Sequence, residues 1–167
     1  MRKANELREY LTRHNRFLNE FPDRLHVFVE QGNIQCSATR SLSHEYRFTL
    51  TIVVTDYAGS TDALMLPLLA WIRVKQPELM ANKDRRENGI SFEVELLDNN
   101  AADVEIKIPL TERVIVQSAG DGKGMIAVHE DEPADEDLPL DAEEITVELP
   151  GFDPVTISIP AWPHPYE

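Results

Sequence analysis

Two aspartates come nearest to a catalytic arrangement in this sequence. Asp56 and Asp62 flank the turn Asp56-Tyr57-Ala58-Gly59-Ser60, and paired carboxylates can act as general acid and general base. Aspartate is also common in turns and at the start of helices, where its oxygens accept backbone hydrogen bonds. We expect these structural roles for both residues, and keep a hydrolase that uses Asp56 or Asp62 as an alternative hypothesis.

Residues that bind metals are scattered along the chain. The five histidines, at positions 14, 26, 44, 129 and 164, show no ligand spacing, and the single cysteine, Cys36, can form no disulfide within the chain. Cys36 lies in an apolar alternation, which predicts a small buried side chain. The stretch 98–103 resembles the opening of a calcium loop, but it has no glycine at the sixth place, and Pro109 stands at the twelfth. We expect no metal and no cofactor.

Glycine-rich residues 120–124 do not form a phosphate-binding motif. The sequence GDGKG lacks the Lys-Ser/Thr ending and the apolar helix that phosphate binding needs. We interpret it as a flexible joint. With no other catalytic motif present, we expect a protein that is not an enzyme and has no catalytic residues.

Charge divides the chain into two parts. Residues 1–88 contain 13 Lys/Arg and 11 Asp/Glu, whereas residues 89–167 contain 3 Lys/Arg and 19 Asp/Glu, a net charge of −16. Nucleic-acid binding needs a basic surface to neutralise phosphates, and we expect no direct nucleic-acid contact. The acidic part favours a basic protein partner.

The N-terminal residues predict an amphipathic helix rather than a targeting signal. Apolar residues recur every three or four positions over 3–20, and charges are spread throughout. The longest apolar run, Ala63–Ile72, is shorter than the roughly 20 residues that span a bilayer. We expect no membrane contact and a cytosolic site of synthesis.

Alternation with a period of two predicts strands after this helix. Leu25–Val29 and Ile34–Ala38, separated by Gly32-Asn33, predict a hairpin. Tyr46–Val54 then alternates over an unusual length, and its semi-polar outer face suggests pairing beyond its own subunit.

A second helix is predicted over Ala63–Lys75, and it is apolar around most of its circumference. Such a helix is normally covered on nearly all sides, so it needs the first helix or a partner chain in addition to a sheet. We expect Tyr57, Leu66 and Trp71 to lie near the core or at an oligomer or partner interface.

Further strands are predicted at 92–96 and 104–116, where Pro109 indicates a strand end or an edge position. Short connections favour antiparallel pairing. We therefore predict an α+β fold, with a mainly antiparallel sheet and two helices packed on one face.

The C-terminal part predicts a tethered hairpin. Residues 130–144 carry nine acidic and no basic side chains, a composition typical of a linker. Beyond it, two alternating runs flank Pro150–Pro154, and an isolated hairpin is marginal in water. We expect it to pair with a neighbour or partner through Ile145, Val147, Val155, Ile157 and Ile159. The predicted organisation is an α+β domain (1–119), a Gly-rich then acidic flexible linker (120–144) and a hairpin arm (145–167).

Residues 42–80, LSHEYRFTLTIVVTDYAGSTDALMLPLLAWIRVKQPELM, resemble the tail-completion protein R family of contractile-tailed temperate phages. The sharpest parts are VTDYAG, PLLAW with its internal proline, QPELM and, later, LTERV. The resemblance covers most of residues 1–117.

This resemblance implies a structural virion protein that completes the tail at its head-proximal end and prepares it for joining to the capsid. Proteins of this family are similar in architecture to tail-terminator proteins, which form rings that are usually hexameric. The implied partners are further copies of this chain, tail tube or sheath proteins, and neck or head-completion proteins, with assembly in the host bacterial cytoplasm. The alternative is a binding module without a ring, which recognises a basic protein through the acidic C-terminal half.

Overall fold

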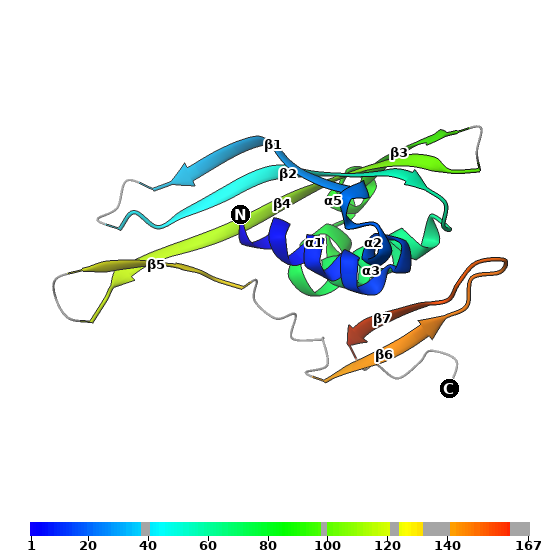
Figure 1. Cartoon of the computed structure of the whole chain (residues 1–167). Helices are drawn as coiled ribbons and strands as arrows, with labels where there is room; N and C mark the ends of the chain where they lie inside the picture. The colour runs from blue at the N-terminus through cyan, green and yellow to red at the C-terminus, as the bar shows by residue number, and fades with distance from the viewer. Residues whose placement is uncertain (38–40, 98–99, 121–123, 132–140, 161–167) are drawn as a thin grey trace.

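A long antiparallel sheet with helices on one face forms the body of the protein, and a separate hairpin lies beyond the helices (Figure 1). The computed structural model describes residues 1–37, 41–97, 100–120, 124–131 and 141–160. The predicted α+β class, the antiparallel sheet, the helices on one face and the C-terminal hairpin are all confirmed. The elements are α1 (Arg2–His14), α2 (Arg16–Glu20), η1 (Pro22–Arg24), β1 (Leu25–Cys36), β2 (His44–Tyr57), α3 (Asp62–Lys75), α4 (Glu78–Ala81), α5 (Lys83–Asn88), β3 (Ser91–Leu96), β4 (Ala102–Ser118), β5 (Met125–His129), β6 (Ala142–Val147) and β7 (Val155–Pro160).

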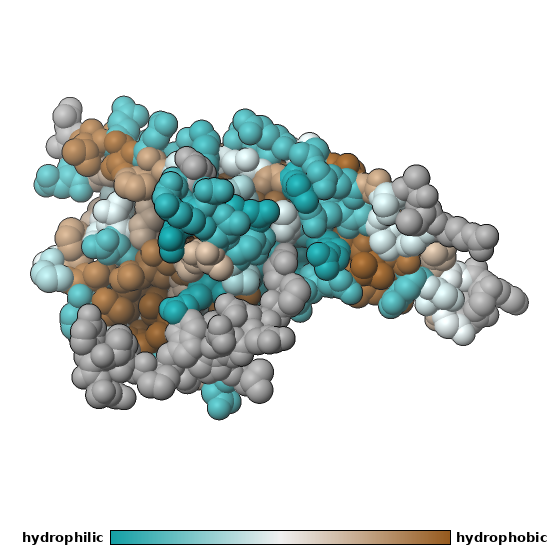
Figure 2. All heavy atoms as spheres, turned by 180° about the vertical axis from the view of Figure 1, so that it is seen from behind, coloured by the Kyte–Doolittle hydropathy of each residue, from teal (hydrophilic) through white to brown (hydrophobic). Residues whose placement is uncertain are grey.

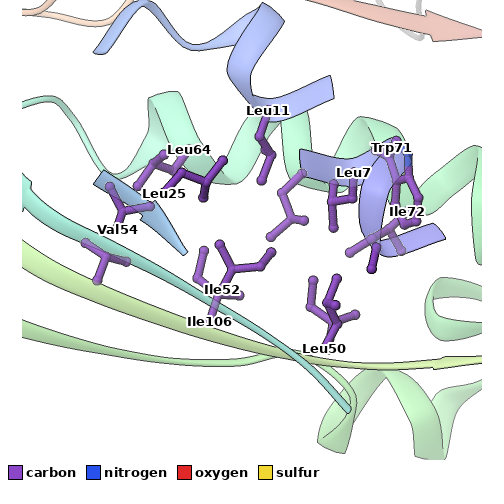
Figure 3. Packing of buried hydrophobic residues seen from close by; sticks show 14 of the residues in the cluster. Leu7, Leu11, Leu25, Leu50, Ile52, Val54, Leu64, Trp71, Ile72 and Ile106 are labelled. Atoms are coloured by element: carbon purple, nitrogen blue, oxygen red, sulfur yellow. The ribbon is translucent and has the colours of Figure 1, made fainter. Parts of the chain in front are cut away.

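The core lies between the inner face of the sheet and the two long helices. Strand alternation places Leu50, Ile52 and Val54 of β2 opposite Ile108, Ile106 and Val104 of β4, and all six side chains are buried. Leu7 and Leu11 of α1 and Leu64 of α3 point toward this surface (Figure 3). The long period-two runs therefore set the register of the sheet, because a slip by one residue would expose this entire face.

The hairpin predicted at Gly32-Asn33 is wrong, because residues 25–36 form a single strand. Leu25–Glu30 and Asn33–Cys36 pair with the same neighbour, β2, in the same direction. Gln31 adopts a positive φ of 51°, and the ladder shifts register between Glu30 and Asn33. A bulge inserts residues without reversing the chain, so the polar residues here mark a bulge rather than a turn.

The expectation that the strand over 46–54 pairs beyond its own subunit is also wrong. The sheet order β1-β2-β4-β3 gives β2 a neighbour on both sides. The edges belong instead to β1, β3 and β5, with β3 and β5 pairing to different stretches of β4. Pro109 lies within the continuous strand β4, between those two stretches, so the strand does not end there. On the side of β4 that faces away from β2, neither β3 nor β5 pairs with Pro109. The predicted edge position is therefore correct for this residue.

The sheet extends past the helices at both ends (Figure 1). This overhang explains Cys36, which is exposed at the end of β1 rather than buried as predicted. Its alternation places it on the inner face, but no helix covers that end of the strand.

The segment 120–144, expected as a linker, contains a strand. Met125–His129 forms β5 and pairs with Val114–Ser118 of β4. Residues 121–123 of the expected flexible joint and residues 132–140 of the acidic run lie outside the described residues. None of the described helices combines the length and the apolar character that crossing a bilayer requires.

Candidate assembly site

The hairpin β6–β7 docks on helix α3 through a second apolar cluster, separate from the main core. On the hairpin, Leu149, Val155 and Ile157 are buried, and they pack with Ala70 of α3. Partly buried side chains surround them: Ala63, Leu66, Val147 and Ile159. Alternation along each hairpin strand turns these residues toward α3, while Glu144, Thr146 and Thr156 face solvent.

Polar contacts hold the hairpin against the N-terminal helices. The Tyr10 hydroxyl donates to the Ser158 carbonyl at 3.3 Å, and His14 Nδ1 bonds the Thr156 carbonyl at 2.9 Å. An exposed ion pair joins Arg16 Nη1 to Asp153 Oδ2 at 2.7 Å. In the described part of the chain, β6 and β7 pair only with each other. The hairpin is therefore held by side chains and a few hydrogen bonds, and not by continuation of the sheet.

This docking accounts for the unusually apolar helix α3. The sheet and α1 cover two of its sides (Figure 3), and the hairpin covers a third. Of the covers expected in addition to the sheet, the first helix is therefore confirmed, and residues about 80 positions later in the sequence supply a further cover that was not predicted. Leu69 and Val74 remain exposed on α3.

The residues predicted at an interface fall into two groups in the structure. Tyr57 and Trp71 are each only 3% exposed and belong to the main core. Leu66, Val147, Val155, Ile157 and Ile159 meet in the hairpin cluster, and Ile145 lies half-buried on the same face of β6. Contact of these residues with a second chain stays a prediction.

Asn15 connects three elements next to this site. Its Oδ1 accepts the Leu18 N–H and caps α2, and its Nδ2 donates to the Tyr57 hydroxyl at 3.0 Å and to the Ala63 carbonyl at 2.9 Å. The Ala63 carbonyl needs this donor because the residue four positions later, Pro67, has no N–H. Asn15 also divides the single helix predicted over 3–20 into α1 and α2, with an extended backbone (φ −123°, ψ 118°).

Tyr57 closes the turn before α3. Its hydroxyl accepts from Asn15 and donates to the Ser60 carbonyl at 3.0 Å. Burial raises the pKa of Tyr57, and the hydrogen bond from Asn15 offsets part of that rise. The turn, the helix break and the start of α3 therefore form one connected polar cluster inside an apolar core.

The two aspartates considered for catalysis have structural roles. Asp56 forms an ion pair with Arg24, and its backbone N–H donates to Asp103 at 2.8 Å. Asp62 is exposed in the first turn of α3, where a negative charge is favourable. No described contact joins the two carboxylates, and among the described residues neither accepts the backbone hydrogen bond that was expected of it.

A buried carboxylate, not predicted from the sequence, anchors α1 to the sheet. Glu112 of β4 accepts the backbone N–H groups of Arg2 at 3.1 Å and Lys3 at 2.8 Å, so it caps the helix from a distant strand. His129 Nδ1 lies 3.3 Å from the same carboxylate, and Lys3 Nζ donates to Gln76 Oε1 at 2.7 Å. The sequence feature that could have identified Glu112 is its acidic side chain at an inward-facing position between Leu110 and Val114.

An open cleft of about 680 Å³ separates the hairpin tip from the Tyr57 turn. Its polar side chains are already bonded within the protein: His14 to Thr156, Arg16 to Glu20 and Asp153, and Tyr57 to Asn15 and Ser60. The described residues contain no group of three or more His, Cys, Asp or Glu side chains that could hold a metal. The cleft is a gap between docked elements.

The site thus consists of an antiparallel sheet with helices on one face and a hairpin docked on α3, an arrangement that suits a structural protein. A family model described as P2 phage tail completion protein R (GpR) matches residues 1–133, and the chain belongs to this family. It is also similar to tail completion protein R of Escherichia phage P2, with 38% identity over 116 residues, which cover 70% of this chain and 75% of the relative. No solved structure matches.

Family membership gives the chain a structural role in completing a phage tail, as a virion component associated with other tail components. The matched residues include the whole five-stranded sheet and its helices. The hairpin at 142–160 lies beyond them.

Proposed function

We propose that this protein forms a ring that closes the head-proximal end of a contractile phage tail and prepares it for joining to the capsid. The observation that carries the proposal is the family match over the whole body of the fold. A subunit with two different open edges, β1 on one side and β5 on the other, suits a head-to-tail ring, because heterologous contacts close by rotation. A hexamer is the ring size we propose.

The partners that follow are further copies of the chain, the last ring of tail tube or sheath subunits, and a neck or head-completion protein. Assembly takes place in the host bacterial cytoplasm, and the ring remains at the head-proximal end of the virion tail. The chemistry required of such a ring is docking, and no catalytic step is part of the proposal.

We also propose that residues 1–119 together with β5 act as the body, the rest of 120–144 as a connection and 145–167 as an arm, and that the arm seats on α3 of the neighbouring copy in the ring. The cluster of Ala70, Leu149, Val155 and Ile157 then forms between chains instead of within one. Support comes from the mode of docking, since no strand ladder ties the described hairpin to the sheet. Residues 132–141 can span up to about 33 Å when extended, and exchange of one element is a low-cost route to oligomers.

One experiment tests the ring. Purified protein is imaged by negative stain alone and after mixing with tails that lack their tail-completion protein. The proposal predicts rings, and density at the head-proximal end of the tails. A strict monomer that does not bind tails would contradict it.

The second candidate is a binding module without a ring, which recognises a basic protein through the acidic half. It is favoured by the net charge of −16 over residues 89–167. Such binding weakens as salt screens the charges. A heteromeric complex with strong salt dependence, formed by a protein that stays monomeric, would select this candidate.

A further inference from the structure

Strand β3 stands at the edge of the sheet, in the part that extends past the helices (Figure 1). Ser91–Leu96 pairs with residues 102–107 of β4 and, among the described strands, with no other. The backbone groups on its outer side therefore lack a strand partner among the described residues. The two faces of β3 both carry side chains that lack cover.

The inner face of β3 is apolar and open to solvent. Phe92, Val94 and Leu96 lie opposite Ile106, Val104 and Ala102 on the core side of the sheet. Their exposed fractions are nevertheless 61%, 37% and 83%, because the helices end before they reach this strand. Figure 2 shows hydrophobic side chains gathered at this tip, at the upper left of the view. Such a patch marks an interaction surface.

The outer face of the same two strands is acidic. Glu93 lies directly opposite Glu105, and Glu95 directly opposite Asp103. Like charges in opposite positions destabilise a strand pair. One cation lies among them: Lys107, whose pKa is raised by its hydrogen bond and attraction to Glu105 and further by Glu93 and Glu30. These two cross-strand pairs leave an excess of negative charge beside an unpaired backbone edge.

We propose that β3 binds an extended strand of another protein, with Lys or Arg on one face and aliphatic side chains on the other. The incoming strand continues the sheet beyond β3 through backbone hydrogen bonds, as in β-strand addition. Its aliphatic face covers Phe92, Val94 and Leu96, and its basic face neutralises Glu93 and Glu95. One alternating strand thereby satisfies the edge and both faces of β3.

A second copy of this chain does not match that description. The strands β1, β3, β5, β6 and β7, which carry the open edges of the described sheets, contain no Lys or Arg. The basic strand residues Arg47, Lys107 and Arg113 lie on β2 and β4, which occupy the middle of the sheet. The positive charge must therefore come from a different protein.

The experiment uses the isolated full-length chain and two synthetic peptides of about ten residues, a length typical of a long strand. One peptide alternates lysine and valine, and the other alternates glutamate and valine. Amide chemical shifts of the labelled protein locate binding, and titration calorimetry measures affinity at low and physiological salt. We expect the lysine peptide to shift residues 91–96 and 102–107, and to bind at least about tenfold tighter than the glutamate peptide.

Three double variants separate recognition from stability. Glu93→Lys with Glu95→Lys turns repulsive cross-strand pairs into attractive ones, so the free chain keeps or gains thermal stability while lysine-peptide affinity falls at least about tenfold. Glu144→Lys with Glu148→Lys makes the same charge change on the exposed face of the hairpin segment, and leaves binding at β3 in place. Phe92→Ser with Leu96→Ser removes the apolar contribution without unfolding the chain, because both side chains are exposed.

Several results would overturn the proposal. The first is failure of the lysine peptide to bind, and the second is equal affinity for both peptides. Chemical-shift changes confined to strands other than β3 and β4 would also contradict it, as would an equal loss of affinity in the β3 charge variant and its hairpin control. Concentration-dependent shifts of residues 91–96 without peptide would assign the edge to a second copy instead. The proposed ring uses the edges at β1 and β5, so the result at β3 leaves the ring proposal untouched.

Discussion

At the scale of single residues, a proline and an asparagine far apart in the sequence form one unit. Pro67 leaves the Ala63 carbonyl without its helical donor, and Asn15 supplies that donor from the junction between α1 and α2. The same side chain caps α2 and bonds Tyr57. The internal proline of α3 is therefore tolerated because a buried amide replaces the hydrogen bond that it removes.

A double-mutant cycle tests this coupling. Asn15→Ala leaves buried polar groups unsatisfied and is expected to lower the free energy of unfolding by about 2–3 kcal/mol. In a Pro67→Ala background the backbone N–H of residue 67 can bond the Ala63 carbonyl, so the cost of Asn15→Ala should be about 1 kcal/mol smaller. Urea unfolding of the four proteins measures this difference, and an equal cost in both backgrounds would refute the coupling.

Tyr57 gives the protein a predictable response to alkaline pH. Its folded pKa lies above the unfolded value of about 10. Stability is fully present below pH 10, and falls above it because the unfolded chain releases the proton first. Tyr57→Phe should cost about 1–2 kcal/mol near neutral pH through lost hydrogen bonds, and should make the alkaline fall shallower.

Urea unfolding of wild type and Tyr57→Phe between neutral pH and pH 11 checks this prediction. The Tyr57→Phe variant should still lose some stability as the pH rises, because burial also raises the pKa of Tyr10. Identical alkaline slopes in the two proteins would show that Tyr57 does not cause the effect.

At the scale of elements, the docked hairpin should open separately from the sheet. Ile157→Asp places a charge in the apolar contact with α3, and no strand ladder among the described residues resists opening. Hydrogen exchange should rise throughout β6 and β7 while β2 and β4 keep their protection. If the arm is exchanged between copies, the same variant also loses the ring.

Thr156→Asp is the matched control, because Thr156 lies on the exposed face of the same strand. It should leave both hairpin protection and oligomer size unchanged. Loss of protection in β2 and β4 of the Ile157→Asp variant would instead show that hairpin and sheet unfold as one unit.

Periodicity predicted some elements of this fold better than others. The run over 46–54 contains enough consecutive alternations to define β2 and its buried face, and the apolar α3 correctly signalled that an additional element must cover it. The bulge at Gln31 was not predictable, because a polar pair before a second alternation also describes a turn. The break at Asn15 was missed because its cause is tertiary, since the partners of the side chain lie at Tyr57 and Ala63.

The apolar face of the hairpin was predictable from the sequence, but its contact with α3 was not. Alternation identified the apolar face of the hairpin, from Ile145 to Ile159. It did not indicate that the chain's own α3 would receive that face, since sequence periodicity carries no information about which surface covers another. The helix-capping role of Glu112 and the exposure of the inner face of β3 were likewise not predictable from the sequence. Both depend on where the helices begin and end over the sheet.

At the scale of the whole molecule, the sheet is longer than the layer that covers it. Both ends extend past the helices (Figure 1), and exposed apolar side chains occur at each, including Ile34 at one end and Leu96 at the other. A protein that acts alone gains nothing from such ends. In the ring that we propose, neighbouring subunits would cover these ends.

The most direct test of this account is cryo-electron microscopy of tails that lack their tail-completion protein, imaged after addition of this chain. The account predicts a closed ring of this chain on the head-proximal end of each tail, and restored joining of those tails to capsids. Tails that remain bare at that end, or density found only at the opposite end, would contradict it.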